Sequence, residues 1–246
     1  MKQLTMAGTL CAAMAGLLSS GSAQAALVDR GRGMLYDTVL NITWLQDANY
    51  AKTSGYDVDG GMDWTRANAW ANGLDYGGYN SGWRLARISP VNGTSFGWND
   101  NFSNDGSTDL GFNITSTFSE LSYMYYVNLG RKGYSSASGA YQPDFGVTGI
   151  GAFGSQKDVG LVRNLQSYVY WSGTAYAPSP AVYAWGFSTY DGIQGNFNQS
   201  DGFFAWAVHD GDIAVVPVPG SVALLAGGLA LLGAVSRRRE RLAVEN

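Results

Sequence analysis

Apolar residues recur at helical spacing in two segments of the chain. The first segment covers residues 62–74, where Asp63 stands at an N-cap position. Its apolar face consists of Trp64, Ala67, Ala71 and Leu74. We expect an amphipathic helix here, ended by the glycine pair at residues 77–78.

The second helical segment lies between Thr117 and Gly130. Thr117 and Glu120 have the spacing of a capping box, and Gly130 is a residue type that ends helices. The shared apolar face consists of Phe118, Leu121, Tyr125 and Leu129. This pattern predicts a helix capped by Thr117.

Elsewhere the pattern favours strands and loops. Residues 28–44 indicate two short strands around a turn, and Trp83 to Leu85 an extended segment. From Tyr168 to Val216, runs of Tyr, Phe, Val and Trp between turn residues indicate antiparallel strands. Long loops are expected up to Gly61, over residues 89–115 and from 131 to 160. Two short helices, antiparallel strands and long loops predict a single α+β domain.

The N-terminal residues 1–25 have the pattern of a secretory signal peptide. Lys2 precedes an apolar stretch from Leu10 to Leu18, and small residues lead to a cut after Ala25. The alternative is a packed N-terminal helix, which the cut-site pattern disfavours. We expect the mature chain to begin at Ala26.

The C-terminal residues 217–246 combine prolines, an apolar run and arginines. Pro217 and Pro219 stand at the start, and the run from Val218 to Ser236 carries no charge. It approaches the length of about 20 residues that a membrane-spanning helix needs. Arg237, Arg238, Arg239 and Arg241 follow it. Clustered positive charge holds that end on the cytoplasmic side, which disfavours the alternative of a buried C-terminal helix.

This tail resembles the PEP-CTERM sorting signal over residues 216–241. In that family a Val-Pro-Glu-Pro motif precedes an apolar helix and an arginine cluster, and Val218 stands here in place of the glutamate. The resemblance implies an exosortase-type sorting protease and the membrane as partners. We therefore expect an exported protein of the cell envelope, cell surface or extracellular matrix of a Gram-negative-type bacterium.

Composition narrows the function of the domain between these ends, residues 26–216. Of 15 Lys and Arg, five lie outside it, as do two of 19 Asp and Glu, which leaves ten basic against seventeen acidic residues. A net charge near minus seven without a basic stripe argues against nucleic-acid binding. The single cysteine, Cys11, lies in the predicted signal, which excludes thiol chemistry, zinc thiolate sites and iron–sulfur clusters from the domain.

Five pieces of the domain carry a further resemblance. They are DTVLNITWLQDANY, DWTRANAWANGLDYGGYNSGWRLAR, SELSYMYYVNLG, NLQSYVYWSGTAY and FFAWAVHDGDI. In this order they cover most of residues 28–215 and resemble the Lcl C-terminal family of bacterial lectin-like modules. Ala86 replaces the family's usual proline, and His209 replaces a frequent arginine. The resemblance implies a C-type-lectin-like fold, which hosts ligand binding far more often than catalysis.

Two glycine motifs match enzyme signatures without their structural context. Residues 93–97 fit the G-x-S-x-G nucleophile elbow around Ser95, but Pro90 precedes them and a polar loop follows. His209 is the histidine available as a base. Residues 149–154 fit G-x-G-x-x-G, but no βαβ unit is expected around them. We expect no catalytic residues.

Carboxylates gather around the turn that precedes the first helix. Asp57, Asp59 and Asp63 offer oxygen ligands that calcium prefers, although the EF-hand spacing is missing. Turn formation and helix capping explain the same residues. A second acidic loop has the same two interpretations and contains Asn99, Asp100, Asn104, Asp105 and Asp109. We expect no cofactor, with calcium as the alternative.

Aromatic residues in expected loops and strand ends are the remaining candidates for binding. Tyr and Trp rings stack on flat partners such as the apolar faces of sugars. The candidates are Trp98, Tyr141, Tyr176, Tyr183 and Tyr190. Simple packing is the alternative for each ring. The tryptophans within the resembling pieces are expected in the core: Trp44, Trp64, Trp83, Trp171 and Trp206.

Together these features predict a non-catalytic adhesion module that binds polysaccharide or another matrix component. One alternative is a structural protein of a biofilm or envelope matrix, which packs against itself or other proteins. The other is an extracellular hydrolase, for which Ser95 is the only support.

Overall fold

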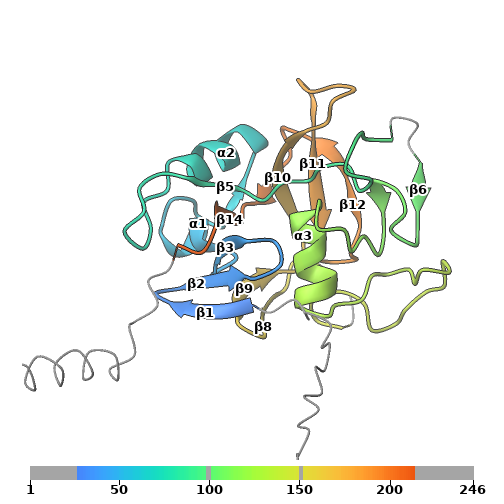
Figure 1. Ribbon diagram of the computed structural model, residues 1–246, viewed down its shortest axis with the longest axis horizontal. Coiled ribbons are helices and arrows are strands. Elements are labelled where there is room, and N and C mark those ends of the chain that lie inside the picture. The colour runs from blue at the N-terminus through green and yellow to red at the C-terminus, as the bar shows by residue number, and fades with distance from the viewer. Residues whose placement is uncertain (1–26, 98–100, 150–151, 214–246) are drawn as a thin grey trace, which may run out of the picture.

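The computed structural model describes residues 27–97, 101–149 and 152–213. The predicted signal peptide, the sorting tail with Pro217, Pro219 and its arginines, and the candidate Trp98 lie outside the described residues. The described part consists of mixed, mostly antiparallel sheets with a few short helices (Figure 1), which confirms the α+β class. None of its helices has both the length and the apolar character needed to span a bilayer.

One sheet of five strands joins the start of the domain to its end. Its order is β1-β2-β3-β14-β5, and all neighbouring strands run antiparallel. The strands are β1 (Leu27–Gly31), β2 (Met34–Asp37), β3 (Ile42–Leu45), β14 (Ala207–Asp210) and β5 (Trp83–Leu85). The last strand, β14, is therefore enclosed, with Val208 opposite Trp44 on one side and Arg84 on the other.

A second sheet of seven strands contains most of the C-terminal third. Its order is β4-β13-β10-β11-β12-β7-β6, in which β10–β13 and β6–β7 are parallel pairs. The strands are β4 (Gly61–Met62), β13 (Phe203–Phe204), β10 (Val169–Ala175), β11 (Tyr183–Ser188), β12 (Gln194–Asn198), β7 (Leu110–Gly111) and β6 (Phe102–Ser103). The prediction of strands from Tyr168 onward is confirmed, but the β10–β13 pairing is parallel because a crossover separates them.

The remaining elements are a hairpin and short helices. The hairpin pairs β8 (Gln156–Val159) with β9 (Val162–Gln166). The helices are α1 (Tyr50–Thr53), α2 (Trp64–Asn72), α3 (Glu120–Tyr123) and the π-helical turn η1 (Met124–Asn128), which continues α3. In Figure 1, α3 stands between the five-stranded sheet and the strands β10 to β12.

Residues 27–45 form three strands, so the prediction of two strands around one turn was wrong. The first turn places residues 31–33 at positive φ, and a second turn places Asn41 at φ 53 before β3. Asp37 stabilises this second turn, because its Oδ1 accepts two backbone N–H groups at 2.9 Å. The segment TVL within the turn contains no glycine or proline and gave no local signal.

The first predicted helix is confirmed as α2. Asp63 is its N-cap, with Oδ1 accepting the backbone N–H of Arg66 at 2.8 Å. The helix ends earlier than predicted, since Gly73 is the C-cap and residues 77–78 lie in the turn beyond it.

The second predicted helix exists, but its expected capping box was wrong. Ser119, not Thr117, is the N-cap of α3. The carboxylate of Glu120 binds the guanidinium of Arg84 instead of closing a box. Phe118, expected on the buried face, is exposed. A long-range ion pair therefore replaced the local cap.

The expected loops contain short elements that local patterns do not indicate. The loop up to Gly61 includes α1 and the first residue of β4, residues 89–115 include β6 and β7, and residues 131–160 include all of β8. Strands of two residues are too short to show an alternating pattern, so they depend on pairing with distant strands.

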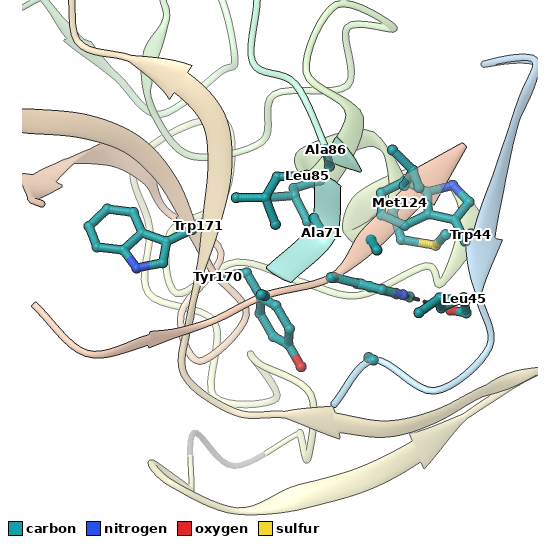
Figure 2. Packing of buried hydrophobic residues seen from close by; sticks show 14 of the residues in the cluster. Trp44, Leu45, Ala71, Leu85, Ala86, Met124, Tyr170 and Trp171 are labelled. Carbon is teal, nitrogen blue, oxygen red and sulfur yellow. Dashed lines mark hydrogen bonds between the residues drawn. The ribbon is translucent and has the colours of Figure 1, made fainter. Parts of the chain in front are cut away.

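The core is rich in aromatic rings (Figure 2). Trp44, Trp83, Trp171 and Trp206 are all fully buried, and Trp64 is partly buried, which confirms the prediction for these residues. Figure 2 shows Tyr170 and Trp171 on opposite sides of β10. Both are shielded from solvent, so this strand is buried on both faces.

Buried indole N–H groups usually find acceptors, and here backbone carbonyls supply some of them, whereas Nε1 of Trp44 and of Trp185 has no hydrogen-bond partner among the described residues. Four tryptophans donate in this way, at distances of 2.7 to 3.2 Å. The acceptors are Leu45 for Trp206, Met62 for Trp171, Ser172 for Trp64 and Tyr79 for Trp83. The bonds of Trp64 and Trp171 tie α2 and β4 to β10, and the bond of Trp206 ties the segment between β13 and β14 to β3.

Candidate functional site

The structure brings two of the predicted aromatic candidates together. Tyr141 and Tyr190 both contact Phe145, with ring centroids 6.1 and 5.7 Å apart. Tyr134 contacts Tyr141 at 5.0 Å, and Phe153 contacts Tyr190 at 5.3 Å. We call the group of Tyr134, Tyr141, Phe145, Phe153 and Tyr190 the aromatic array.

The array combines exposed rings with a buried centre. Tyr134, Tyr141 and Phe153 are 45%, 59% and 64% exposed, whereas Phe145 is 6% exposed. Tyr190 is half-buried. Phe145 thus anchors the group in the domain while three rings meet solvent. A contiguous exposed group of large apolar side chains is typical of a binding surface.

The far end of the array rests on the seven-stranded sheet. Phe153 packs on Tyr168 with centroids 4.6 Å apart. Tyr168 in turn contacts Phe203 and Phe204 of β13 at 5.8 and 5.9 Å. The exposed rings are therefore continuous with the aromatic core.

Hydrogen bonds from the domain hold the loop that carries Tyr134, Tyr141 and Phe145. The hydroxyl of Tyr125 in η1 donates to the carbonyl of Lys132 at 2.7 Å. Asn113 donates its Nδ2 to the carbonyl of Ser135 at 2.8 Å. The backbone N–H of Tyr134 donates to the carbonyl of Asp191 at 2.6 Å. This loop therefore has a defined conformation before any ligand arrives.

The turn that carries Tyr190 is held in a similar way. The hydroxyl of Tyr126 donates to the carbonyl of Gly192 at 2.8 Å. Burial raises the pKa of both Tyr125 and Tyr126, so these hydroxyls stay protonated and act as donors at physiological pH. Gly192 adopts φ 86, a conformation that glycine adopts without strain.

Charged side chains beside the array contact other groups of the domain. Lys132 contacts Asp144 at 2.5 Å on the same loop, and this hydrogen bond lowers the pKa of the carboxyl. Asp191 accepts the backbone N–H of Ile193 at 3.2 Å. The ion pair neutralises Lys132, while Arg131 on the same loop donates its Nε to the carbonyl of Leu129 at 3.1 Å.

The other two described candidates lie in a separate group. Tyr176 contacts Trp185 at 5.3 Å, and Phe96 stacks on the same indole at 5.3 Å. Trp185 is buried, so this contact supports the packing interpretation for Tyr176. Tyr183 begins β11 and is exposed, and its backbone bonds to that of Tyr176.

Each of the three aspartates considered for calcium has a local structural role. Asp57 accepts the N–H groups of Asp59 and Gly60 and pairs with Arg66 at 3.0 Å. Asp59 accepts the N–H of Gly61, and Asp63 caps α2. Although burial opposes it, hydrogen bonding lowers the pKa of Asp57. Within residues 27–97, 101–149 and 152–213, no three His, Cys, Asp or Glu side chains are placed to hold a metal ion.

The second acidic loop also uses its carboxylates to hold backbone. Buried Asp109 accepts the N–H of Val91 at 2.7 Å and of Gly97 at 2.6 Å. Asp105 accepts the hydroxyl and the N–H of Ser107. Asn99 and Asp100 fall in a gap of the described chain.

The residues of the two enzyme motifs lie in other settings. Ser95 is in a turn whose N–H groups donate to Asn92, and the described residues beside it contain neither a strand before it nor a helix after it. His209 lies in β14 and packs against Tyr79 and Trp83 with centroids 5.6 Å apart. Residues 149–154 are only partly described, and a strand rather than a helix follows them.

Sequence reasoning did not single out Tyr134, Phe145 and Phe153. Each lies in the glycine-rich segment from 131 to 160, which was expected to be a loop. Large aromatic side chains in such a segment are unusual for a solvated loop and were an available signal. Their contacts with one another depend on how the loop folds back.

Shallow hollows are present elsewhere on the described surface. One of about 410 Å³ lies at the start of α2 and is lined by Asp63, Val182 and Gln199 among others. Another, of about 320 Å³, lies between α1 and α2 beside Tyr56 and Trp70. Neither includes a ring of the aromatic array.

Comparison with known proteins identified no relative: no family model, no curated protein and no solved structure matches the chain. Function must therefore be inferred from the residues of the chain and their arrangement.

Proposed function

We propose that this chain is an exported, non-catalytic adhesion module that binds polysaccharide through the aromatic array. The observation that carries the proposal is the continuous row of rings with Tyr141 and Phe153 most exposed. Sugar rings have apolar faces bordered by hydroxyl groups. Exposed aromatic rings beside polar loop residues can stack on those faces while the hydroxyls stay solvated.

The defined conformation of the loop supports binding rather than simple exposure. Tyr125 and Asn113 hold its backbone from two directions. A surface that is ordered in advance loses less conformational entropy when a ligand binds. This lowers the cost of association for a ligand that makes few hydrogen bonds.

The position of the array suits a module tethered by its C-terminus. In Figure 1 the yellow-green loop of residues 131–149 and the red end of the described chain lie at opposite sides of the domain. If the predicted tail sorts or anchors the protein at the envelope, this loop lies on the side of the domain away from the end of the described chain. The proposed C-type-lectin-like fold agrees with this role and rests on the resemblance of residues 28–215.

Binding of full-length protein to polysaccharides tests the proposal. Native electrophoresis through gels containing hydroxyethylcellulose, xylan, galactomannan, laminarin or dextran measures retardation by each polymer. We expect at least one polymer to retard the wild type. Tyr141→Ala and Phe153→Ala should each weaken binding by about threefold to tenfold, the effect of losing one aromatic contact.

Tyr56→Ala is the matched control, since Tyr56 is 50% exposed but lies outside the array. It should bind as the wild type does. The proposal fails if no polymer retards the wild type, or if all three variants behave alike.

The alternative, a structural matrix protein, is favoured by the same exposed rings, because apolar patches also mediate protein association. Sedimentation velocity of the same variants separates the two functions. Self-association that Tyr141→Ala or Phe153→Ala abolishes, without retention by any polymer, would favour the structural role.

A further inference from the structure

We infer that the array binds an internal stretch of an uncharged polysaccharide chain that contacts Tyr141 and Phe153 at the same time. This inference rests on the proposed function and names its ligand class. It follows from the extent of the array, its openness and its charge.

The two most exposed rings of the array, those of Tyr141 and Phe153, are separated by other rings. Tyr141 and Phe153 are not in ring contact with each other; Phe145 and Tyr190 lie between them in the series. One pyranose ring is similar in size to one phenyl ring and can cover only one of them. A ligand that uses both exposed rings must therefore be longer than a single sugar.

The exposure of the array favours a ligand that is not enclosed by the protein. Recognition of a chain end or a small molecule usually needs a concave pocket that encloses most of the ligand. The two hollows described above are lined by other residues, and the side chains of Tyr134, Tyr141 and Phe153 are 45% to 64% exposed. Exposed rings leave room for a polymer chain to continue past them.

The charges of the domain favour an uncharged ligand. The cation of Lys132 is bound to Asp144, and Arg131 donates its Nε to the carbonyl of Leu129 at 3.1 Å. Residues 26–216 carry more acidic than basic groups, so an anionic polymer approaches against the field of the domain. The hydroxyls of Ser136 and Ser138 bond to each other on the same loop, and Nε2 of Gln142 donates to the carbonyl of Gly133. The acceptor capacity left on these side chains suits neutral hydroxyl groups.

The test uses oligosaccharide ladders, from monosaccharide to hexasaccharide, prepared from each neutral polymer that retards the full-length protein. Isothermal titration calorimetry measures the dissociation constant for each length. We expect affinity to rise by about tenfold or more between the shortest and longest members, as a second ring becomes engaged. Alginate and heparin oligosaccharides of equal length should bind more weakly.

Single and double alanine variants identify the rings that cause the dependence of affinity on chain length. Tyr141→Ala and Phe153→Ala should each flatten the dependence on length, because only one exposed end remains. The double variant should also lose most of the binding of short sugars, which each single variant keeps at its remaining exposed ring. Tyr56→Ala should keep the wild-type length dependence.

The possible failures are distinguishable. If polymers are retained but monosaccharide and hexasaccharide bind equally well, or anionic ladders bind best, the inference is wrong while the proposed function stands. If no polymer is retained, the proposed function itself fails and the inference falls with it.

Discussion

The guanidinium of Arg84 in β5 faces the carboxylate of Glu120 in α3, with two N–O contacts of 2.8 and 2.9 Å. Arg84 also contacts Asp210 of β14 at 2.5 Å. Burial lowers the pKa of Arg84, but its bonds to Glu120 and Asp210 outweigh this and raise it overall. The largely buried pair of Arg84 and Glu120 fixes α3, and with it η1 and Tyr125, against the five-stranded sheet.

Removing the charge of Glu120 should therefore destabilise the domain. Glu120→Gln keeps the size of the side chain but weakens its bonds to Arg84 and to the backbone N–H of Arg87. We expect the free energy of unfolding to fall by about 2–3 kcal/mol, as for a charged hydrogen-bonded pair. Urea denaturation measures the change. Asp105→Asn, at an exposed turn, should change stability little, and equal losses in both variants would contradict this role of Glu120.

Asp210 should make stability depend on pH in the acidic range. The hydrogen bond from Arg84 lowers the pKa of Asp210 below its ordinary value of 3.8. A carboxyl with a lowered pKa in the folded state stabilises the fold above the unfolded value, and the gain is lost as pH falls through the folded value. The melting temperature of the wild type should therefore drop more steeply below about pH 4 than that of Asp210→Asn.

A matched control for this pH series is Asp201→Asn, at an exposed turn before β13. Its melting temperature should fall with decreasing pH as steeply as that of the wild type. Parallel curves for the wild type and Asp210→Asn would show that the contact with Arg84 does not contribute to acid stability.

Gly60 should be intolerant of a side chain, unlike Gly55. Both have positive φ, at 89 and 76, but a Cβ at Gly60 would collide with Oδ1 of buried Asn49, whereas Gly55 has open space. Gly55→Ala should cost about 1 kcal/mol from backbone strain. Gly60→Ala should cost about 3 kcal/mol because Asn49 must also move. Thermal denaturation of the two variants measures the loss of stability in each. Similar losses in both would contradict the role of Asn49.

Loosening the array loop should weaken binding without removing a ring. Asn113 has φ 58 and donates its amide to the carbonyls of Asn104 and Ser135. In Asn113→Gly, glycine adopts the same backbone conformation, but both side-chain hydrogen bonds are lost. Binding to the polymer should therefore weaken by about threefold to tenfold, which corresponds to the loss of two hydrogen bonds. The loop then has to be ordered by the ligand.

Asn41→Gly provides the comparison for Asn113→Gly. Asn41 also has positive φ, and its side chain accepts the hydroxyl of Tyr36 at 2.9 Å, away from the array. Its binding should match that of the wild type. Unchanged binding by Asn113→Gly would show that a preordered loop is not required.

Local patterns in the sequence predicted the elements whose stability depends on neighbouring residues. Asp63 and the apolar face behind it predicted α2, because a cap and a helical period act within a few residues. The aromatic and β-branched runs after Tyr168 predicted β10, β11 and β14 for the same reason. The tryptophans expected in the core are all buried or partly buried.

Elements that depend on distant partners were not predictable in this way. Glu120 was expected to cap its own helix, but Arg84 offers a charge that a local backbone N–H cannot match. The strands β6 and β7 have two residues each and exist only because they pair within the larger sheet.

The sequence by itself determined the α+β class, the aromatic core and two members of the candidate surface, Tyr141 and Tyr190. The tertiary structure alone decided that these two rings belong to one array with Phe145, and that Tyr176 packs on Trp185 instead. The physical reason is the range of the interactions: caps and periodicity act between residues close in sequence. Ring contacts across folded loops depend on long-range hydrogen bonds, such as that from Asn113 to Ser135.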